Sequence, residues 1–241
     1  MKIKYIKPTF LILLVIVSFY FTACKKFVAV DDPNDQFNSD KVFSDSTTAT
    51  GAVTGIYSEM LTNRNLFANS ATTLYAGMAA DELYYYTPGL KDEFSNNQIT
   101  QENHINIDNS FWIPAYKYIY AANLCIEKLS QSQKLSISLK NQLTGEAKFI
   151  RAFCYFHLIN LFGDVPFLTS TRYQDNATAP RVAMSEVYSQ IINDLIEAKT
   201  LLTAKYATSQ KVRPNKWAAA ALLSRCYLVS ARKRPLFIYM Y

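Results

Sequence analysis

The longest run of hydrophobic positions lies in residues 145–166, which read GEAKFIRAFCYFHLINLFGDVP. From Ala147 to Phe162 there is no glycine or proline, and apolar side chains recur on every side of a helix with 3.6 residues per turn. A helix that is hydrophobic all round is buried on several sides, so we expect other helices to pack around it. Gly163 and Pro166 predict its end, because glycine tolerates the left-handed conformation and proline cannot continue a helix.

Periodic apolar positions predict two consecutive helix pairs in the second half of the chain, roughly residues 111–162 and 183–230. In the second pair, Ser185 is a candidate cap for the first helix, and Pro214 suits the first turn of the second helix. Paired amphipathic helices of this length resemble tetratricopeptide-type units, which stack and share a core. The pattern therefore predicts an all-α fold built from tetratricopeptide-like helix pairs.

The first half of the chain is less regular. A helix is expected over residues 46–62, capped by Ser46 or Thr47. A second helical patch covers residues 71–86, although its threonines and tyrosines also suit a strand. Residues 87–109 are polar and rich in asparagine, which predicts a long loop, and long loops in compact domains are often functional.

The first residues have the pattern of a processing segment. Three lysines precede an apolar run of about a dozen residues, Phe10 to Phe21, whereas a membrane-spanning helix needs roughly 20. Small residues then precede Cys24, as in a bacterial lipoprotein signal. We expect a signal peptide over residues 1–23 and acylation of Cys24; an uncleaved anchor or ordinary secretion with a free Cys24 is the alternative.

The remaining chain divides into three parts by composition. Residues 24–45 are polar and predict an extended tether behind the lipidated cysteine, and residues 46–230 predict one helical domain. Residues 231–241 are an atypical tail, in which a basic triplet and Pro235 precede a hydrophobic hexapeptide. This tail suggests a truncated protein or a frameshift.

Composition and charge exclude several classes of protein. Half of the 241 residues are hydrophobic, with only 6 Gly and 8 Pro, which argues against a turn-rich β-sandwich and against disorder. The formal charge is +6, from 25 basic and 19 acidic residues. Loss of the three signal lysines leaves 22 basic residues and a charge of +3, with no basic stripe. We therefore expect no nucleic-acid partner.

Cysteine and histidine usage predicts neither a metal site nor a cofactor. Cys125, Cys154 and Cys226 each lie in an apolar helical run, so buried free thiols are expected, with one disulfide as the alternative. The two histidines, His104 and His157, are far apart and lack ligand spacing. His157 lies within the hydrophobic helix and is expected to be a hydrogen-bonded core histidine.

Residues 81–109 combine the side chains that recognise sugars. Sugars present C–H surfaces ringed by hydroxyl groups, so a binding site needs exposed aromatic faces together with amide or carboxylate partners. Alternatively, the tyrosines pack beneath the loop and the amides form turns. The candidate glycan-binding residues are Asp81, Tyr84, Tyr85, Tyr86, Asn96, Asn97, Gln98 and His104.

Catalysis is not expected. Asp81 and Glu82 form an adjacent carboxylate pair in this segment. Glycosidases need two carboxyl groups about 5–9.5 Å apart that face one bond, whereas adjacent side chains diverge in a helix and point to opposite faces of a strand. No Gly-rich phosphate loop or nucleophile elbow is present either.

Several phrases together resemble the SusD/RagB family of outer-membrane nutrient-binding lipoproteins. They occur in the family's order from Cys24 to about Ser230: KFV after the lipoprotein cysteine, ATGAVTGIY from Ala49, Asp81-Glu82, Trp112 with Tyr116 and Asn123, GEAKFIRAFCYFHLINLFGDVPF from Gly145, and RVAMSEVYSQIINDLIEAKTLL from Arg181. The phrase from Gly145 is the most specific of these.

This resemblance implies an all-α fold in which long loops form the ligand face. It also implies a cell-surface lipoprotein that binds glycans, or sometimes peptides, without cleaving them. The implied partner is a SusC-like TonB-dependent transporter in the outer membrane, over which such proteins act as a lid. Family members are about twice as long, so the chain is expected to hold the N-terminal half. The alternative function is a membrane-anchored helical-repeat scaffold that binds peptide or protein.

The lipid anchor can be tested directly. Because each buried CH₂ of an acyl chain contributes about 0.8 kcal/mol to membrane binding, we expect Cys24→Ala to move the protein from the membrane fraction to the soluble fraction. Membrane fractionation of both forms measures this. Unchanged membrane retention of the variant would contradict lipidation.

Overall fold

The structure, a computed structural model, describes residues 39–62, 67–87 and 89–231. In this part of the chain the elements are helices apart from one sheet of two short strands, so the predicted all-α class is confirmed. None of the described helices is long and apolar enough to cross a membrane. The predicted signal peptide, Cys24 and the tail after Ala231 lie outside the described residues.

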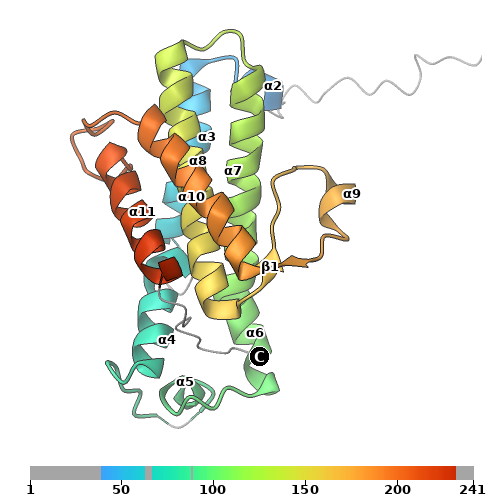
Figure 1. The fold of residues 1–241 in the computed structure, drawn as a ribbon, viewed down its shortest axis with the longest axis vertical. Coiled ribbons are helices and arrows are strands. Elements are labelled where there is room, and N and C mark those ends of the chain that lie inside the picture. The colour runs from blue at the N-terminus through green and yellow to red at the C-terminus, as the bar shows by residue number, and fades with distance from the viewer. Residues whose placement is uncertain (1–38, 63–66, 88, 232–241) are drawn as a thin grey trace, which may run out of the picture. The chain divides into compact units, whose positions relative to one another are not determined.

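The second half of the chain forms four helices (Figure 1): α7 (Ile113–Gln131), α8 (Ile137–Phe162), α10 (Met184–Leu201) and α11 (Lys216–Ala231). Helix α8 packs against α7 on one side and α10 on the other, and α11 packs against α10. The two predicted helix pairs are thus α7 with α8 and α10 with α11.

Helix α8 is buried as its sequence predicts. Residues spaced along its length are shielded from solvent, and their exposed fractions are at most 1% at Leu143, Ile150 and Leu158. At Gly145, an added Cβ would lie 2.9 Å from a side-chain carbon of Leu202, so glycine permits the close approach of α8 to the end of α10. The expectation that other helices surround this segment is confirmed.

A buried ion pair joins three of the long helices. On α8, Arg151 donates from Nε to Oδ2 of Asp194 and from Nη2 to Oδ1, both at 2.7 Å. Its remaining nitrogen, Nη1, donates to Oδ1 of Asn123 on α7 at 2.8 Å. All three residues are buried. Bidentate geometry makes this contact strong and directional, and it sets α7 and α10 against α8.

A second buried ion pair holds the segment between α10 and α11. Glu146 of α8 is fully buried and accepts from Nη2 of Arg213 at 2.6 Å and from Nε at 3.0 Å. Gln142, one turn earlier, donates to the same carboxylate at 2.7 Å. The carboxylate therefore fastens the 203–215 segment to α8.

The N-terminal part begins with α2 (Ser39–Val42) and α3 (Ser46–Thr62). Helix α2 lies within the stretch expected to be an extended tether, and Phe43 joins the core, so folded structure starts no later than Ser39. The expectation that Ser46 or Thr47 caps α3 is wrong. The cap is Asp45, whose Oδ1 accepts from the N–H groups of Thr47 at 2.9 Å and Thr48 at 3.0 Å. These hydrogen bonds, that from Thr48 first, lower the pKa of Asp45.

Two other predicted helix starts are also wrong by one or two residues. Helix α10 begins at Met184 rather than after a Ser185 cap, and the Met184 N–H donates to the distant carboxylate of Asp164 at 2.9 Å. Helix α11 begins at Lys216 rather than Pro214, since Asn215 accepts from two N–H groups of its first turn. Asp164 is brought to α10 from elsewhere in the fold and leaves no local spacing signal, whereas Asn215 is a local cap directly before α11.

The stretch predicted as a patch and a long loop is a series of short helices: η2 (Phe67–Ala71), α4 (Thr72–Ala79), α5 (Asp92–Ser95), η3 (Gln101–Asn103), α6 (His104–Ile107) and η4 (Asp108–Trp112). The patch expected over residues 71–86 is helical only to Ala79 and then extends without a strand partner. The predicted loop over 87–109 is wrong because Phe94 and Ile107 are buried in the core and tie it down. These short helices gather at one end of the bundle (Figure 1).

The connection between α8 and α10 contains two short strands and one short helix. Strand β1 (Val165–Pro166) pairs antiparallel with β2 (Arg181–Val182), and α9 (Tyr173–Asn176) lies in the connection. Asn123 also donates to the carbonyl of Leu168 at 2.9 Å. The connection between the two strands, residues 167–180, is thus closed at its base by their pairing.

The buried ion pair gives a stability prediction. Asp194→Ala leaves the guanidinium of Arg151 buried without its charge partner, which typically costs about 3–5 kcal/mol. We expect a clear fall in the urea midpoint of unfolding measured by circular dichroism. The matched control is Asp175→Ala, which breaks the exposed pair with Arg172 and should leave the midpoint unchanged. Equal effects of the two variants would contradict the structural role of the buried pair.

Candidate functional site

A cavity of about 460 Å³ lies at the end of the bundle where the short helices gather. Its lining comes from η2, α4, the extended segment after α4, the residue before α5, α6 and η4. The polar and aromatic members include Tyr75, Tyr84, Tyr85, Lys91 and Asn106. Cavities of this size are typical of small-ligand sites.

Buried aromatic contacts hold the walls of this cavity. The ring of Tyr75 lies 4.4 Å from that of Phe94 on α5 and 5.6 Å from that of Phe111 on η4. Asn103 is buried and donates to the carbonyl of Leu90 at 2.6 Å and to Glu93 at 3.1 Å. The short helices are thereby fixed to α4 although none of them is long enough to be stable alone.

Three consecutive tyrosines follow α4 and differ in their surroundings. Tyr84 and Tyr86 are 82% and 83% exposed, whereas Tyr85 is half-buried and packs against the core. The rings of Tyr85 and Tyr86 stack at 6.2 Å, and the ammonium of Lys91 lies 5.0 Å from the centre of the Tyr85 ring. Packing beneath the loop, the alternative interpretation, therefore applies to Tyr85, and two aromatic side chains stay open to solvent.

The amide residues lie at the end of α5. Asn96, Asn97 and Gln98 are all exposed. Asn97 adopts a left-handed conformation with φ of 53°, and its side chain donates to the carbonyl of Ala79 at 3.2 Å. Asn97 therefore has a turn-forming role that joins the ends of α5 and α4. The side chains of Asn96 and Gln98 make no hydrogen bond to another residue in the part of the chain that the structure describes.

Asp81 and His104, the remaining candidates, are exposed as well. Asp81 ends α4 with φ of 59°, and its N–H donates to the carbonyl of Met78 at 3.2 Å. His104 begins α6, with Nδ1 2.7 Å from the carbonyl oxygen of Gln101. Of the eight sequence-predicted residues, only Tyr84 and Tyr85 line the cavity.

Sequence reasoning missed several lining residues. Tyr75 and Met78 belong to α4, Lys91 precedes α5, and Asn106 and Ser110 lie on the following short helices. No motif marks them, because they meet only when α4 packs against the short helices. The one available signal is the asparagine content of the segment, which includes Asn106.

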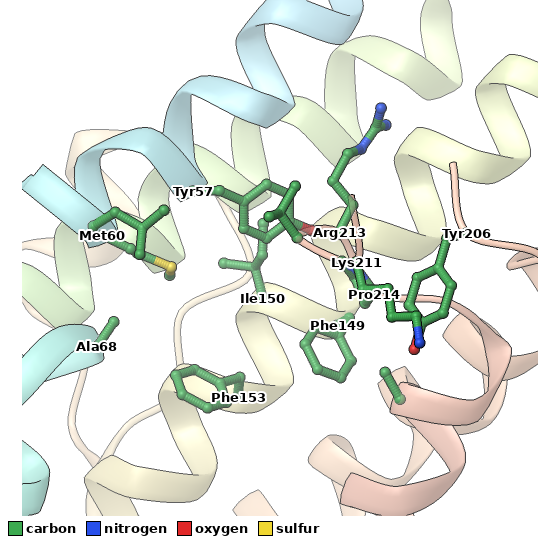
Figure 2. Close-up of a pocket in the computed structure, with 13 residues that line it drawn as sticks. Tyr57, Met60, Ala68, Phe149, Ile150, Phe153, Tyr206, Lys211, Arg213 and Pro214 are labelled. Atoms are coloured by element: carbon green, nitrogen blue, oxygen red, sulfur yellow. The ribbon is translucent and has the colours of Figure 1, made fainter. Parts of the chain in front are cut away.

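A second cavity, of about 350 Å³, lies between α3, α8 and the segment before α11 (Figure 2). Phe149 and Phe153 of α8 and Tyr206 of the segment supply aromatic walls. The guanidinium of Arg213 points away from the two phenylalanines in Figure 2, consistent with its pairing with Glu146. Two nitrogens of this guanidinium are therefore already engaged by Glu146.

Side chains suited to metal binding or nucleophilic chemistry are not assembled in the described residues. No group of three or more His, Cys, Asp or Glu residues there is placed to hold a metal ion. Cys125, Cys154 and Cys226 are free and buried, as expected. His157 is 3.0 Å from the carbonyl oxygen of Phe153 through Nδ1, and burial lowers its pKa, which confirms the core histidine.

Comparison with known proteins identifies the family. Residues 26–228 match the SusD-like family described as starch-binding and associating with the outer membrane. This chain belongs to the SusD-like family. A SusD-like protein of Formosa agariphila is 25% identical over 225 residues, which cover 90% of this chain and 42% of that relative. Another from the same organism is 32% identical over 184 residues, covering 73% of this chain and 35% of the relative.

Solved structures support the same fold. A SusD-like protein from Bacteroides fragilis is 27% identical and superimposes with a TM-score of 0.67, over 85% of this chain and 39% of that one. A laminarin-binding SusD-like protein is 26% identical with a TM-score of 0.61, over 79% and 41% of the two chains. This SusD-like chain therefore spans about two fifths of the length of these relatives.

The buried thiols give a second prediction. Burial raises the pKa of Cys125 and of Cys226 to about 12 and that of Cys154 further. A thiol with a pKa of about 12 is ionised in only about one molecule in 10,000 at pH 8, and the thiolate is the reactive form. We expect Ellman's reagent at pH 8 to titrate no thiol in folded Cys24→Ala protein and three after unfolding in urea. Rapid reaction of the folded protein would contradict the burial.

Proposed function

We propose that this SusD-like protein captures a glycan at the cell surface without cleaving it. The observation that carries the proposal is a pair of solvent-exposed tyrosines: Tyr84, which lines the cavity formed by the short helices, and Tyr86, two residues further along the chain. Exposed aromatic rings offer flat faces to the C–H surface of a sugar, and amides such as Asn96 and Gln98 supply hydrogen-bonding groups to its hydroxyls. The family description and the laminarin-binding relative support a glycan as the ligand.

The pre-formed walls of the site favour binding. The tyrosine segment follows directly on α4, and α4 is held by the packing of Tyr75 against Phe94 and Phe111. A ligand that meets side chains already fixed by packing loses less free energy to ordering them. Asp81 and His104, which are exposed but do not line the cavity, remain candidate contacts to the glycan.

The proposal extends to location and partner. Acylation of Cys24 would hold the protein on the outer membrane, and the family description supports association with that membrane. The protein would then deliver its oligosaccharide to a SusC-like TonB-dependent transporter, for which it forms a lid. Co-purification of such a barrel with affinity-tagged protein from native outer membranes tests this partner, and its absence from a stable preparation would count against it.

Removal of the tyrosine faces tests the site. We expect Tyr84→Ala/Tyr86→Ala to weaken binding of laminarin or starch by at least about tenfold, because loss of a stacking anchor costs about 1–2 kcal/mol each at binding sites. Affinity electrophoresis in gels containing each polysaccharide measures the change. The matched control is Tyr173→Ala on α9, which removes a tyrosine that is 80% exposed elsewhere and should leave binding unchanged.

The outcome also separates the two functions considered. Equal loss of binding in the control, or no loss in the double variant, would remove the tyrosine site from the proposal. A glycan microarray without any binding, together with clear binding of peptides, would instead favour the helical-repeat scaffold.

A further inference from the structure

The segment that forms the candidate glycan site carries a charge opposite to that of the rest of the chain. Residues 81–110 contain six carboxylates and one lysine, a formal charge of −5, whereas the whole chain carries +6. The residues outside this segment therefore carry +11. The acidic residues are Asp81, Glu82, Asp92, Glu93, Glu102 and Asp108.

Four of these carboxylates flank the cavity along the chain. Asp81 and Glu82 directly precede the lining residues of segment 83–85, Asp92 follows the lining lysine, and Asp108 lies between two lining residues. Each is within two residues of the lining, so the Cα atoms are at most about 7 Å apart. This spacing is comparable with the Debye length of about 8 Å at physiological ionic strength, so any effect of these charges at the cavity should depend on salt.

These charges are not neutralised within the described residues. None of the ion pairs found there includes any of the six carboxylates. Glu93 is bound by neutral donors, the N–H of Thr100 at 2.8 Å and the amide of Asn103 at 3.1 Å. The hydrogen bond from the Thr100 backbone lowers the pKa of Glu93, so this carboxylate stays ionised at neutral pH.

One positively charged side chain at the cavity offsets part of this negative charge. Lys91 lines it, and its ammonium lies over the ring of Tyr85. With the four flanking carboxylates, the lysine leaves a formal charge of −3 around the cavity. Like charges placed together suppress the binding of a wrong partner, whereas an uncharged partner meets no such penalty.

We propose that this site selects uncharged glycans and disfavours polyanionic ones, such as uronate-rich or sulfated polysaccharides. The inference rests on the proposed function, because it names the class of glycan for the same site. Stacking on Tyr84 and Tyr86 does not depend on the charge of the sugar. Two glycans that share a backbone and differ only in charge are therefore distinguished by the carboxylates.

The test compares matched glycans on the full chain. Affinity electrophoresis is run with laminarin and starch, and with the carboxymethylated derivative of each, at ionic strengths of about 0.01 M and about 0.5 M. We expect the carboxymethylated glycans to bind at least about tenfold more weakly at low ionic strength, a difference of about 1.4 kcal/mol. The gap should close at high ionic strength, where the Debye length falls below about 8 Å.

A charge variant assigns the effect to the site. We expect Glu82→Gln/Asp108→Asn to raise affinity for the carboxymethylated glycans at least about threefold at low ionic strength, with affinity for the neutral glycans unchanged. The control, Glu127→Gln/Glu197→Gln, removes the same charge from α7 and α10, outside the 81–110 segment. It should alter neither affinity.

The outcomes separate this inference from the proposed function. Carboxymethylated glycans that bind as tightly as neutral ones at low ionic strength overturn the inference, as does a gap that neither salt nor the site variant changes. In both cases the proposed glycan binding stands. Failure to bind any glycan of the panel, neutral or anionic, overturns the proposed function and the inference with it.

Discussion

Helix α8 is enclosed by α3, α7, α10 and the segment before α11, and its charged side chains must therefore find partners inside the protein. Arg151 meets Asp194 and Asn123, and Glu146 meets Arg213. Desolvating such groups is costly unless each hydrogen bond is made. The two contacts consequently specify how the neighbouring elements sit around α8, and hydrophobic burial alone would not set that register.

The candidate site depends indirectly on this packing around α8. The short helices at the end of the bundle cannot form alone, and Phe94, Ile107 and Phe111 fix them by entering the same core as α7 and α8. With those side chains buried, the segment after α4 is left with Tyr84 and Tyr86 open to solvent. A stable core and an exposed aromatic surface thus arise from one packing arrangement.

The distribution of charge is a separate property of the chain. Acidic residues concentrate in 81–110 while the rest of the chain is basic, and this asymmetry is invisible in the net charge of +6. Of the six carboxylates, Glu93 contributes to the fold by accepting hydrogen bonds from Thr100 and Asn103. All six lie on or next to turns and short helices, and none is buried. In the proposed site, the acidic charge bears on which ligand approaches the cavity.

The sequence by itself determined the all-α class, the two helix pairs, the buried α8 and the family, since these follow from periodicity and from phrases contiguous in the chain. It also identified the tyrosines of the candidate site, because their crowding after α4 is a local signal. Only the tertiary structure decided the cap that Asp164 gives to α10, the short helices in the expected loop, and the joining of Tyr75, Lys91 and Asn106 around one cavity. The reason is physical: these features depend on contacts between residues far apart in sequence, or on burial of single side chains, and neither leaves a periodic pattern.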